Sequence, residues 1–214
     1  MTNHLIPNLL DVSLCLVALF ISVRSFDIYS RSRQSRVFIL GLSMVLVSLS
    51  AAADFTANYI NSSPARVIIL HTDWFLFIGQ AVGFLFILLS LMWSSDNYLR
   101  SLVRLNSVAV ALLLILLLLS PALPPMGILT QTVFNFTRFI ACLLIFFVYF
   151  TGYMSKPTRF SLFMSISFFF FTADYLMTLE QNYTPVFNQN LIIALADIVG
   201  VLGLVMLVGA VSWE

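Results

Sequence analysis

The chain has 214 residues, of which 61% are hydrophobic and only 9% are charged. A soluble domain is roughly 45–50% apolar and about 25% charged, so this composition excludes a water-soluble core. The net charge of +1 gives no indication of a nucleic-acid partner. Cys15 and Cys142 both lie inside apolar runs, which predicts small buried side chains rather than a disulfide framework or a metal motif.

Seven apolar segments approach the roughly 20 residues that a helix needs to cross a bilayer. The first carries Asp11 and follows no basic segment, so we expect a retained span rather than a cleaved signal peptide. The sequence predicts an all-α integral membrane protein, a seven-transmembrane-helix bundle forming one domain over residues 1–214. The predicted spans are Leu9–Val23, Val37–Tyr59, Val67–Trp93, Leu102–Leu119, Ile128–Tyr153, Phe160–Leu179 and Leu191–Trp213.

Basic residues are concentrated in alternate loops. Eight lie after the first, third and fifth spans, whereas Arg66 alone lies in the opposite set of loops. The positive-inside rule then predicts an N-terminus outside and a C-terminus in the cytoplasm. The arginine-rich inner loops are also the predicted docking place of a cytoplasmic or membrane protein partner. The eight are Arg24, Arg31, Arg33, Arg36, Arg100, Arg104, Lys156 and Arg159.

Matching residues indicate an internal repeat. Asp54 and Asp174 each precede a tryptophan, Trp93 or Trp213, by 39 residues. A further pair, Asp73 and Asp197, matches after a four-residue shift. These pairs predict a 3+1+3 parallel repeat, with repeat one over about 9–93, a linker helix over about 102–119 and repeat two over about 128–213.

The four carboxylates of the predicted repeat define a candidate site. The predicted spans place them in one layer, about 8–9 Å below the outer surface at a rise of 1.5 Å per residue. An ionised group in hydrocarbon is costly, so it normally faces a protein interior or a water-filled cavity. We therefore predict an outward-facing acidic pocket for a ligand, an ion or a proton. Its primary carboxylates are Asp54, Asp73, Asp174 and Asp197.

One intramembrane cation accompanies this layer. Gln131, Asn135, Arg138 and Cys142 recur at helical spacing and form one polar stripe on the fifth span. Arg138 is predicted to face the carboxylates and to set their charge state or gate the pocket. The secondary members of the predicted site are His71, Gln80, Asn135 and Asp11.

Residues His71–Trp74 resemble the Asp-Trp element on the third helix of microbial rhodopsins, and Asp197 resembles the counterion on their seventh helix. Four residues after Asp197, however, stands Val201, and the only lysine, Lys156, lies in a predicted loop. A retinal Schiff base on the seventh helix is therefore excluded. We predict no organic cofactor, although the acidic pocket suits a bound cation.

Three functions remain open on the sequence. The leading hypothesis is a small transporter or carrier for a cation or polar solute, with proton coupling. The alternative is a receptor-like seven-helix sensor or membrane-partner subunit, and the third is a metal-assisted intramembrane hydrolase. The only histidines are His4 and His71, and no zincin, Walker or nucleophile-elbow pattern occurs, so the sequence favours a non-enzymatic function and identifies no metal. The expected partners are the lipid bilayer and a small ion or polar solute.

Overall fold

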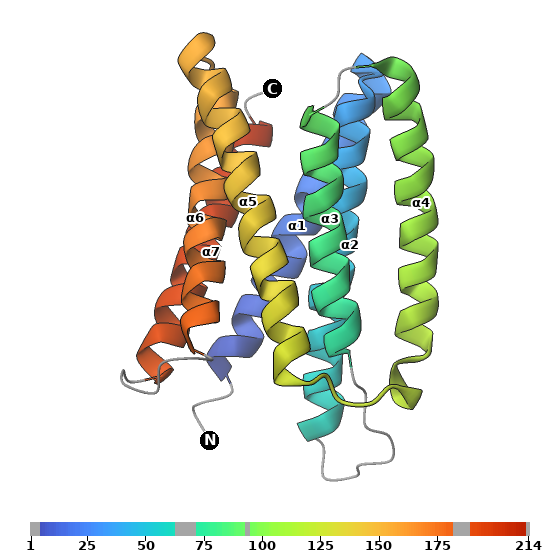
Figure 1. Ribbon diagram of the computed structural model, residues 1–214, viewed down its shortest axis with the longest axis vertical. Coiled ribbons are helices and arrows are strands. Elements are labelled where there is room, and N and C mark those ends of the chain that lie inside the picture. The colour runs from blue at the N-terminus through green and yellow to red at the C-terminus, as the bar shows by residue number, and fades with distance from the viewer. Residues whose placement is uncertain (1–4, 63–71, 93–94, 182–188, 213–214) are drawn as a thin grey trace.

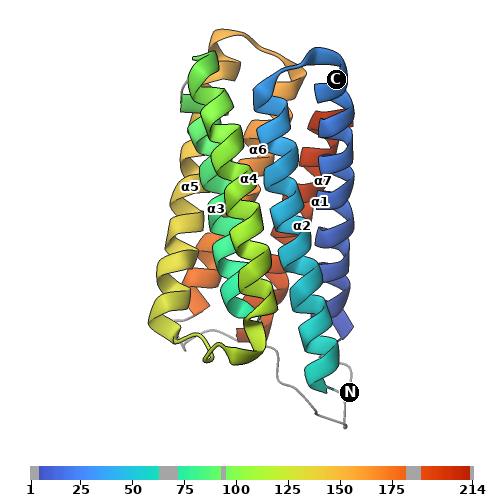
Figure 2. The same ribbon diagram turned by 90° about the vertical axis from the view of Figure 1, so that its right-hand side faces the viewer.

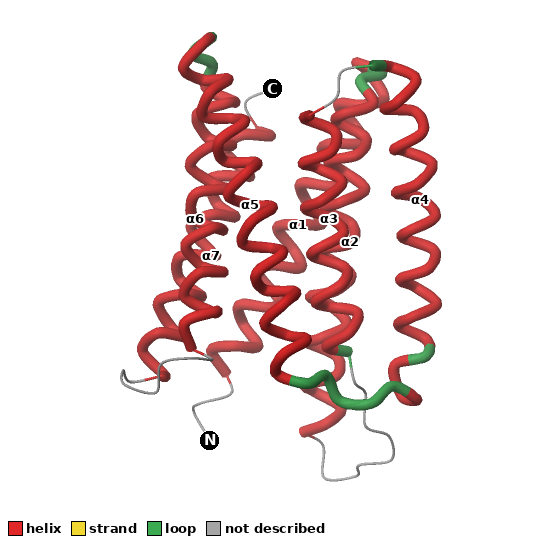
Figure 3. Tube along the Cα trace, viewed as in Figure 1, coloured by secondary structure: helices red, strands yellow, loops and turns green. Residues whose placement is uncertain are grey.

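The computed structural model describes residues 5–62, 72–92, 95–181 and 189–212. Over these residues the chain forms seven long α-helices and one short 3-10 turn (Figure 3). In chain order they are α1 (Leu5–Ser32), α2 (Ser35–Ser62), α3 (Asp73–Met92), α4 (Asp96–Leu118), η2 (Ser120–Ala122), α5 (Ile128–Ser155), α6 (Arg159–Gln181) and α7 (Gln189–Ser212).

Six of the helices in the described ranges, α1 to α6, are long and apolar enough to cross a membrane. The seventh, α7, is 24 residues long and contains the shorter apolar stretch Ile198–Ser212. A helix of this length satisfies within itself the backbone hydrogen bonds of the part that lies in hydrocarbon, which is the condition for crossing a membrane. The protein is an integral multi-pass membrane protein.

The contacts of α1, α2, α3, α5, α6 and α7 close a ring, and α4 lies outside it (Figures 1 and 2). Around the ring, α1 packs on α2, α2 on α3, α3 on α5, α5 on α6, α6 on α7 and α7 on α1. Helix α4 packs mainly on α2, α3 and the turn that follows it. We call α1–α3 the first triad, α5–α7 the second triad, and the contact between α3 and α5 the seam. Since α3 and α5 run in the same direction, α4 returns the chain between them.

All six ring helices contribute to one apolar core. Its fully or almost fully buried side chains include Ile21, Met44, Phe84, Ile145, Phe168 and Leu207. Glycines allow close helix contacts at its edges. A Cβ atom at Gly83 would lie 3.2 Å from the carbonyl oxygen of Ser43 on α2, and one at Gly203 would lie 3.2 Å from Phe171 on α6. Small residues of this kind let helix backbones approach closely in membranes.

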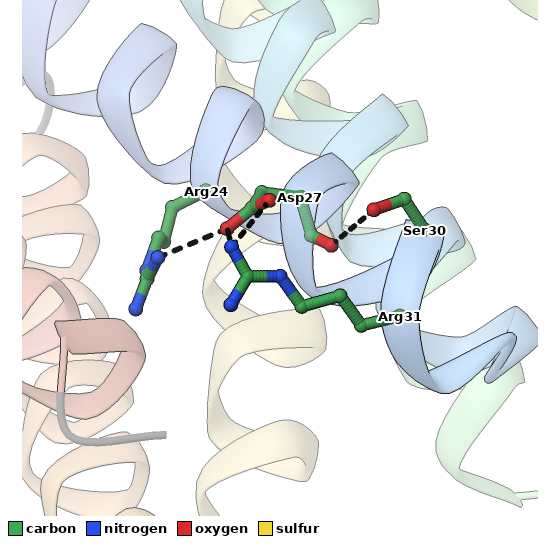
Figure 4. Close-up of polar contacts among 4 residues, drawn as sticks. All are labelled: Arg24, Asp27, Ser30 and Arg31. Carbon is green, nitrogen blue, oxygen red and sulfur yellow. Dashed lines mark hydrogen bonds and ion pairs between the residues drawn. The ribbon is translucent and has the colours of Figure 1, made fainter.

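The helices at one end continue beyond the predicted spans. Helix α1 ends at Ser32 instead of near Val23, so Arg24 and Arg31 lie on a helix and not in a loop. Both donate to the carboxylate of Asp27, over 3.0 and 3.1 Å (Figure 4). The arginines favour helix, and their ion pairs with Asp27 stabilise α1 past the apolar stretch. We call this end, uppermost in Figure 1, the basic end.

Other helix ends also differ from the predicted ones. Arg36 lies in the first turn of α2, and Arg100 lies within the first turns of α4. At the opposite end, α3 begins at Asp73 and not at Val67, which lies outside the described residues. Asp73 therefore stands at the start of its helix rather than about six residues inside it.

Candidate functional site

Helix α5 presents its polar stripe to the interior of the ring. Asn135, Arg138 and Cys142 are all buried, because their spacing keeps them on one face of the helix. Gln131, one turn nearer the end of α5, is half-buried. Its side-chain amide donates to the carbonyl oxygen of Met126 over 3.4 Å, so it holds the preceding loop instead of joining the interior.

The guanidinium of Arg138 lies at the seam and connects three helices. Its Nη1 donates to Oε1 of Gln80 on α3, and its Nη2 donates to Oδ1 of Asn135 on α5. The Tyr175 hydroxyl on α6 donates to the same Gln80 oxygen over 3.3 Å. The guanidinium carbon lies 4.4 Å from the ring centre of Phe77 and 4.9 Å from that of Tyr175. We call these five residues the Arg138 centre.

The hydrogen-bond acceptors of this cation are neutral amide oxygens. An arginine carries five N–H donors, and the buried Nε atom of Arg138 has no hydrogen-bond partner among the described residues. Cation–π contact contributes about 0.5–2 kcal/mol, whereas removing a charge from water costs several. The positive charge of the centre is therefore incompletely compensated, and a nearby carboxylate or a bound group can compensate it further.

Asp174 is the predicted carboxylate whose described side chain adjoins this centre. It directly precedes Tyr175 on α6. Its negative charge interacts favourably with the positive charge of Arg138. A Cβ atom at Gly200 would lie 3.1 Å from Asp174 Oδ2, so the carboxylate rests against the backbone of α7. The Asp174 carboxylate therefore faces the last helix of the ring, next in sequence to a member of the Arg138 centre.

The remaining predicted residues fall into two groups. Asp73 is half-buried at the start of α3, where a carboxylate also interacts favourably with the helix dipole. It lies seven residues, or about 10 Å along the helix axis, from Gln80. The side chains of Asp11, Asp54 and Asp197, and the whole of His71, lie outside the described part of the chain.

Sequence reasoning missed two members of the Arg138 centre, Phe77 and Tyr175. Phenylalanine is frequent throughout this chain, so the periodicity of Phe77 carries no distinguishing signal. Tyr175 carried such a signal, because it directly follows Asp174 and because a buried tyrosine hydroxyl normally needs a hydrogen-bond partner.

A column of aromatic rings leads from the Arg138 centre towards the basic end. Successive ring centres are 5.9 Å apart for Tyr175 and Phe84, 6.3 Å for Phe84 and Phe168, 6.2 Å for Phe168 and Tyr149, and 6.1 Å for Tyr149 and Phe160. Phe84 and Phe168 are buried in the core. These rings separate the polar centre from the basic end with tightly packed apolar material.

At the far end of this column lies a cavity of about 220 Å³, which we call the basic-end cavity. Helices α2, α3, α5 and α6 and the residue that precedes α2 line it, so it spans both triads. Its lining residues are Gln34, Arg36, Val37, Leu40, Ile87, Ser90, Leu91, Tyr149 and Phe160.

No protein-family model, no curated protein and no solved structure matches this chain. Within the described ranges, no three His, Cys, Asp or Glu side chains gather as metal ligands would.

Proposed function

We propose that this protein is a small membrane carrier for a cation or polar solute, coupled to protons through Asp174. One observation carries the proposal: a buried guanidinium at the seam between two triads, hydrogen-bonded to neutral amides of both. Purely structural contacts need no such charge, since apolar side chains of similar volume often stabilise a buried site as well or better. Intramembrane ionisable residues characteristically mark pathways for ions, protons or substrates.

The arrangement of the helices supports a carrier. Exchanging α1, α2 and α3 with α5, α6 and α7 leaves the ring contacts unchanged, because α3–α5 becomes α7–α1. This is the contact pattern expected of two parallel repeats about an axis along the membrane normal. Carriers built from repeats bind their substrates at the interface between them.

Local packing supports the same correspondence, in which α3 of the first triad is equivalent to α7 of the second. Gly79 and Gly203 each stand six residues after an aspartate of the predicted repeat. A Cβ atom at Gly79 would lie 3.4 Å from the Ser50 hydroxyl of α2, and the Ser167 hydroxyl of α6 donates to the Gly203 carbonyl over 2.7 Å. In both triads a serine of the middle helix thus meets a glycine of the last.

In the proposed cycle, Asp174 takes up the proton or the cation. Neutralising its charge changes the compensation of Arg138 within the second triad, and with it the hydrogen bonds of Arg138 and Tyr175 to Gln80 that hold the seam. The aromatic column closes the path towards the basic end in the present conformation. With the basic end in the cytoplasm, as the positive-inside rule predicts, the present conformation is closed towards the inside. Further negative charge near the outer side would come from Asp54, Asp73 and Asp197.

The test uses purified protein in liposomes that enclose a pH-sensitive dye. A potassium diffusion potential set by valinomycin, negative inside, drives uptake, and Na⁺ or choline is then added outside. We expect a protein-dependent change of internal pH that one of these cations alters. Asp174→Asn should abolish the change, whereas Asp27→Asn, an acidic residue remote from the seam, should retain it. Equal signals from Asp174→Asn and wild type would contradict the proposal.

A receptor-like sensor is the second candidate, favoured by the helical extension of α1 at the basic end. There the side chain of Arg31 is 75% exposed, although it pairs with Asp27, and offers a charged surface to a partner. A sensor would bind a cation at Asp174, beside the Arg138 centre, without moving it. Cation-dependent thermal stabilisation in detergent, together with the absence of flux in the liposomes, would select this candidate.

A further inference from the structure

The basic-end cavity is chemically distinct from the Arg138 centre. Its lining includes the polar side chains of Arg36, Ser90 and Tyr149 and aliphatic side chains such as Leu40 and Leu91. Arg36 and Gln34 are exposed, so the cavity opens at the surface of the bundle. A ligand that fits it must therefore have one charged or polar part and one apolar part.

The charge of the basic end favours an anion. Eight of the ten basic residues belong to this end, against the acidic residues Asp27 and Asp96 in its described part. Asp27 pairs with Arg24 and Arg31 within α1. The guanidinium of arginine also matches the oxygens of a phosphate in geometry, through two parallel N–H donors.

The volume restricts what the anion can be. Pockets for complete small-molecule ligands usually measure about 300–1,000 Å³, so about 220 Å³ suits a group smaller than a complete ligand of that kind. A phosphate with the adjoining part of a lipid head group is smaller. Basic pockets between transmembrane helices commonly hold such head groups, where the apolar wall continues along the acyl chains.

We propose that the basic-end cavity binds the phosphate group of an anionic membrane lipid. Arg36 neutralises the phosphate, and the first part of an acyl chain lies against Leu40 and Leu91. Because Tyr149 and Phe160 belong to the second triad and Arg36 to the first, the bound lipid holds the two triads together at this end. The inference does not depend on what the Arg138 centre transports.

Thermal unfolding of delipidated protein in a neutral detergent tests the proposal. Phosphatidylglycerol should raise the melting temperature in a saturable way, because it binds the folded state. Phosphatidylcholine and inorganic phosphate should have little effect. Arg36→Gln should raise the concentration of phosphatidylglycerol for half-maximal effect at least about tenfold, because it removes the cation that binds the phosphate. Arg104→Gln, an exposed arginine outside the cavity, should leave that concentration close to the wild-type value.

A second variant distinguishes a loss of lipid binding from a folding defect of Arg36→Gln. Val37→Trp keeps Arg36 but fills the cavity, and should also remove the response to phosphatidylglycerol. Equal responses in wild type, Arg36→Gln and Val37→Trp would overturn the proposal, because the lipid would then act by general adsorption. A full shift with inorganic phosphate alone would overturn the assignment of the ligand as a lipid.

Discussion

Replacing Gln80 with leucine tests directly whether the buried guanidinium depends on its amide acceptors. Leucine has nearly the volume of glutamine but accepts no hydrogen bond. The change removes the acceptor of the bond from Arg138 Nη1 and of the 3.3 Å bond from the Tyr175 hydroxyl. Both donors remain buried, and the charge on Arg138 remains as well.

The expected loss of stability is about 3 kcal/mol. A hydrogen bond to a charged group contributes about 1.5–3 kcal/mol, and a neutral bond between membrane helices contributes about 0.6 kcal/mol. For a protein of about 200 residues, each kcal/mol shifts the melting temperature by about 2–4 °C. Gln80→Leu should therefore melt about 6–12 °C below wild type.

Thr172→Val is the matched control. Its hydroxyl is also buried, but it donates to Phe168 of its own helix over 2.7 Å, so the cost should stay below about 1 kcal/mol. The double variant Gln80→Leu with Arg138→Met should be more stable than Gln80→Leu alone, since it removes the unpaired charge. Melting of Gln80→Leu within about 2 °C of wild type, or strictly additive losses in the double variant, would refute the reasoning.

Further predictions use the same melting assay. Gly200→Ala should lower the free energy of unfolding by about 1–3 kcal/mol, because its methyl group would press on the Asp174 carboxylate. Gly152→Ala, with open space around the glycine, should raise that free energy by about 0.5–1 kcal/mol. The reverse order would be evidence against the close contact between α6 and α7. Arg33→Gly should raise stability by about 0.5–1 kcal/mol, because Arg33 has φ 57° and a side chain is disfavoured there; a lower melting temperature would contradict this. Asp27→Asn should cost less than about 1 kcal/mol, and the loss should shrink in about 0.5 M salt because its ion pairs are exposed; a salt-independent loss would point to another cause.

Strong periodicity made the polar face of α5 predictable. Asn135, Arg138 and Cys142 share a face at any rotation of the helix, so an arginine among apolar residues had to turn that face inward. The partners of Arg138 were less accessible to prediction. Phe77 and Tyr175 come from two other helices, and their approach depends on how those helices pack, which no local pattern encodes.

Helix ends were predicted less well than helix centres. Hydrophobicity reports where hydrocarbon begins, but a helix stops where its backbone hydrogen bonds stop. Arg24 and Arg31 extend α1 because they favour helix and pair with Asp27 one turn away. At Arg33 a left-handed conformation closes the turn, and an arginine there gives no sequence signal of the kind that a glycine would.

The loop between α4 and α5 is fastened at one point. The indole nitrogen of Trp74, near the start of α3, donates to the carbonyl oxygen of Pro124 over 2.8 Å. This hydrogen bond ties the loop that leads into the second triad to α3 of the first triad, at the end opposite the basic end. In the proposed carrier, a rotation of one triad against the other would have its axis near this hydrogen bond. Displacements would grow with distance from it and would therefore be large at the basic end, where Arg36 and Tyr149 line one cavity from different triads.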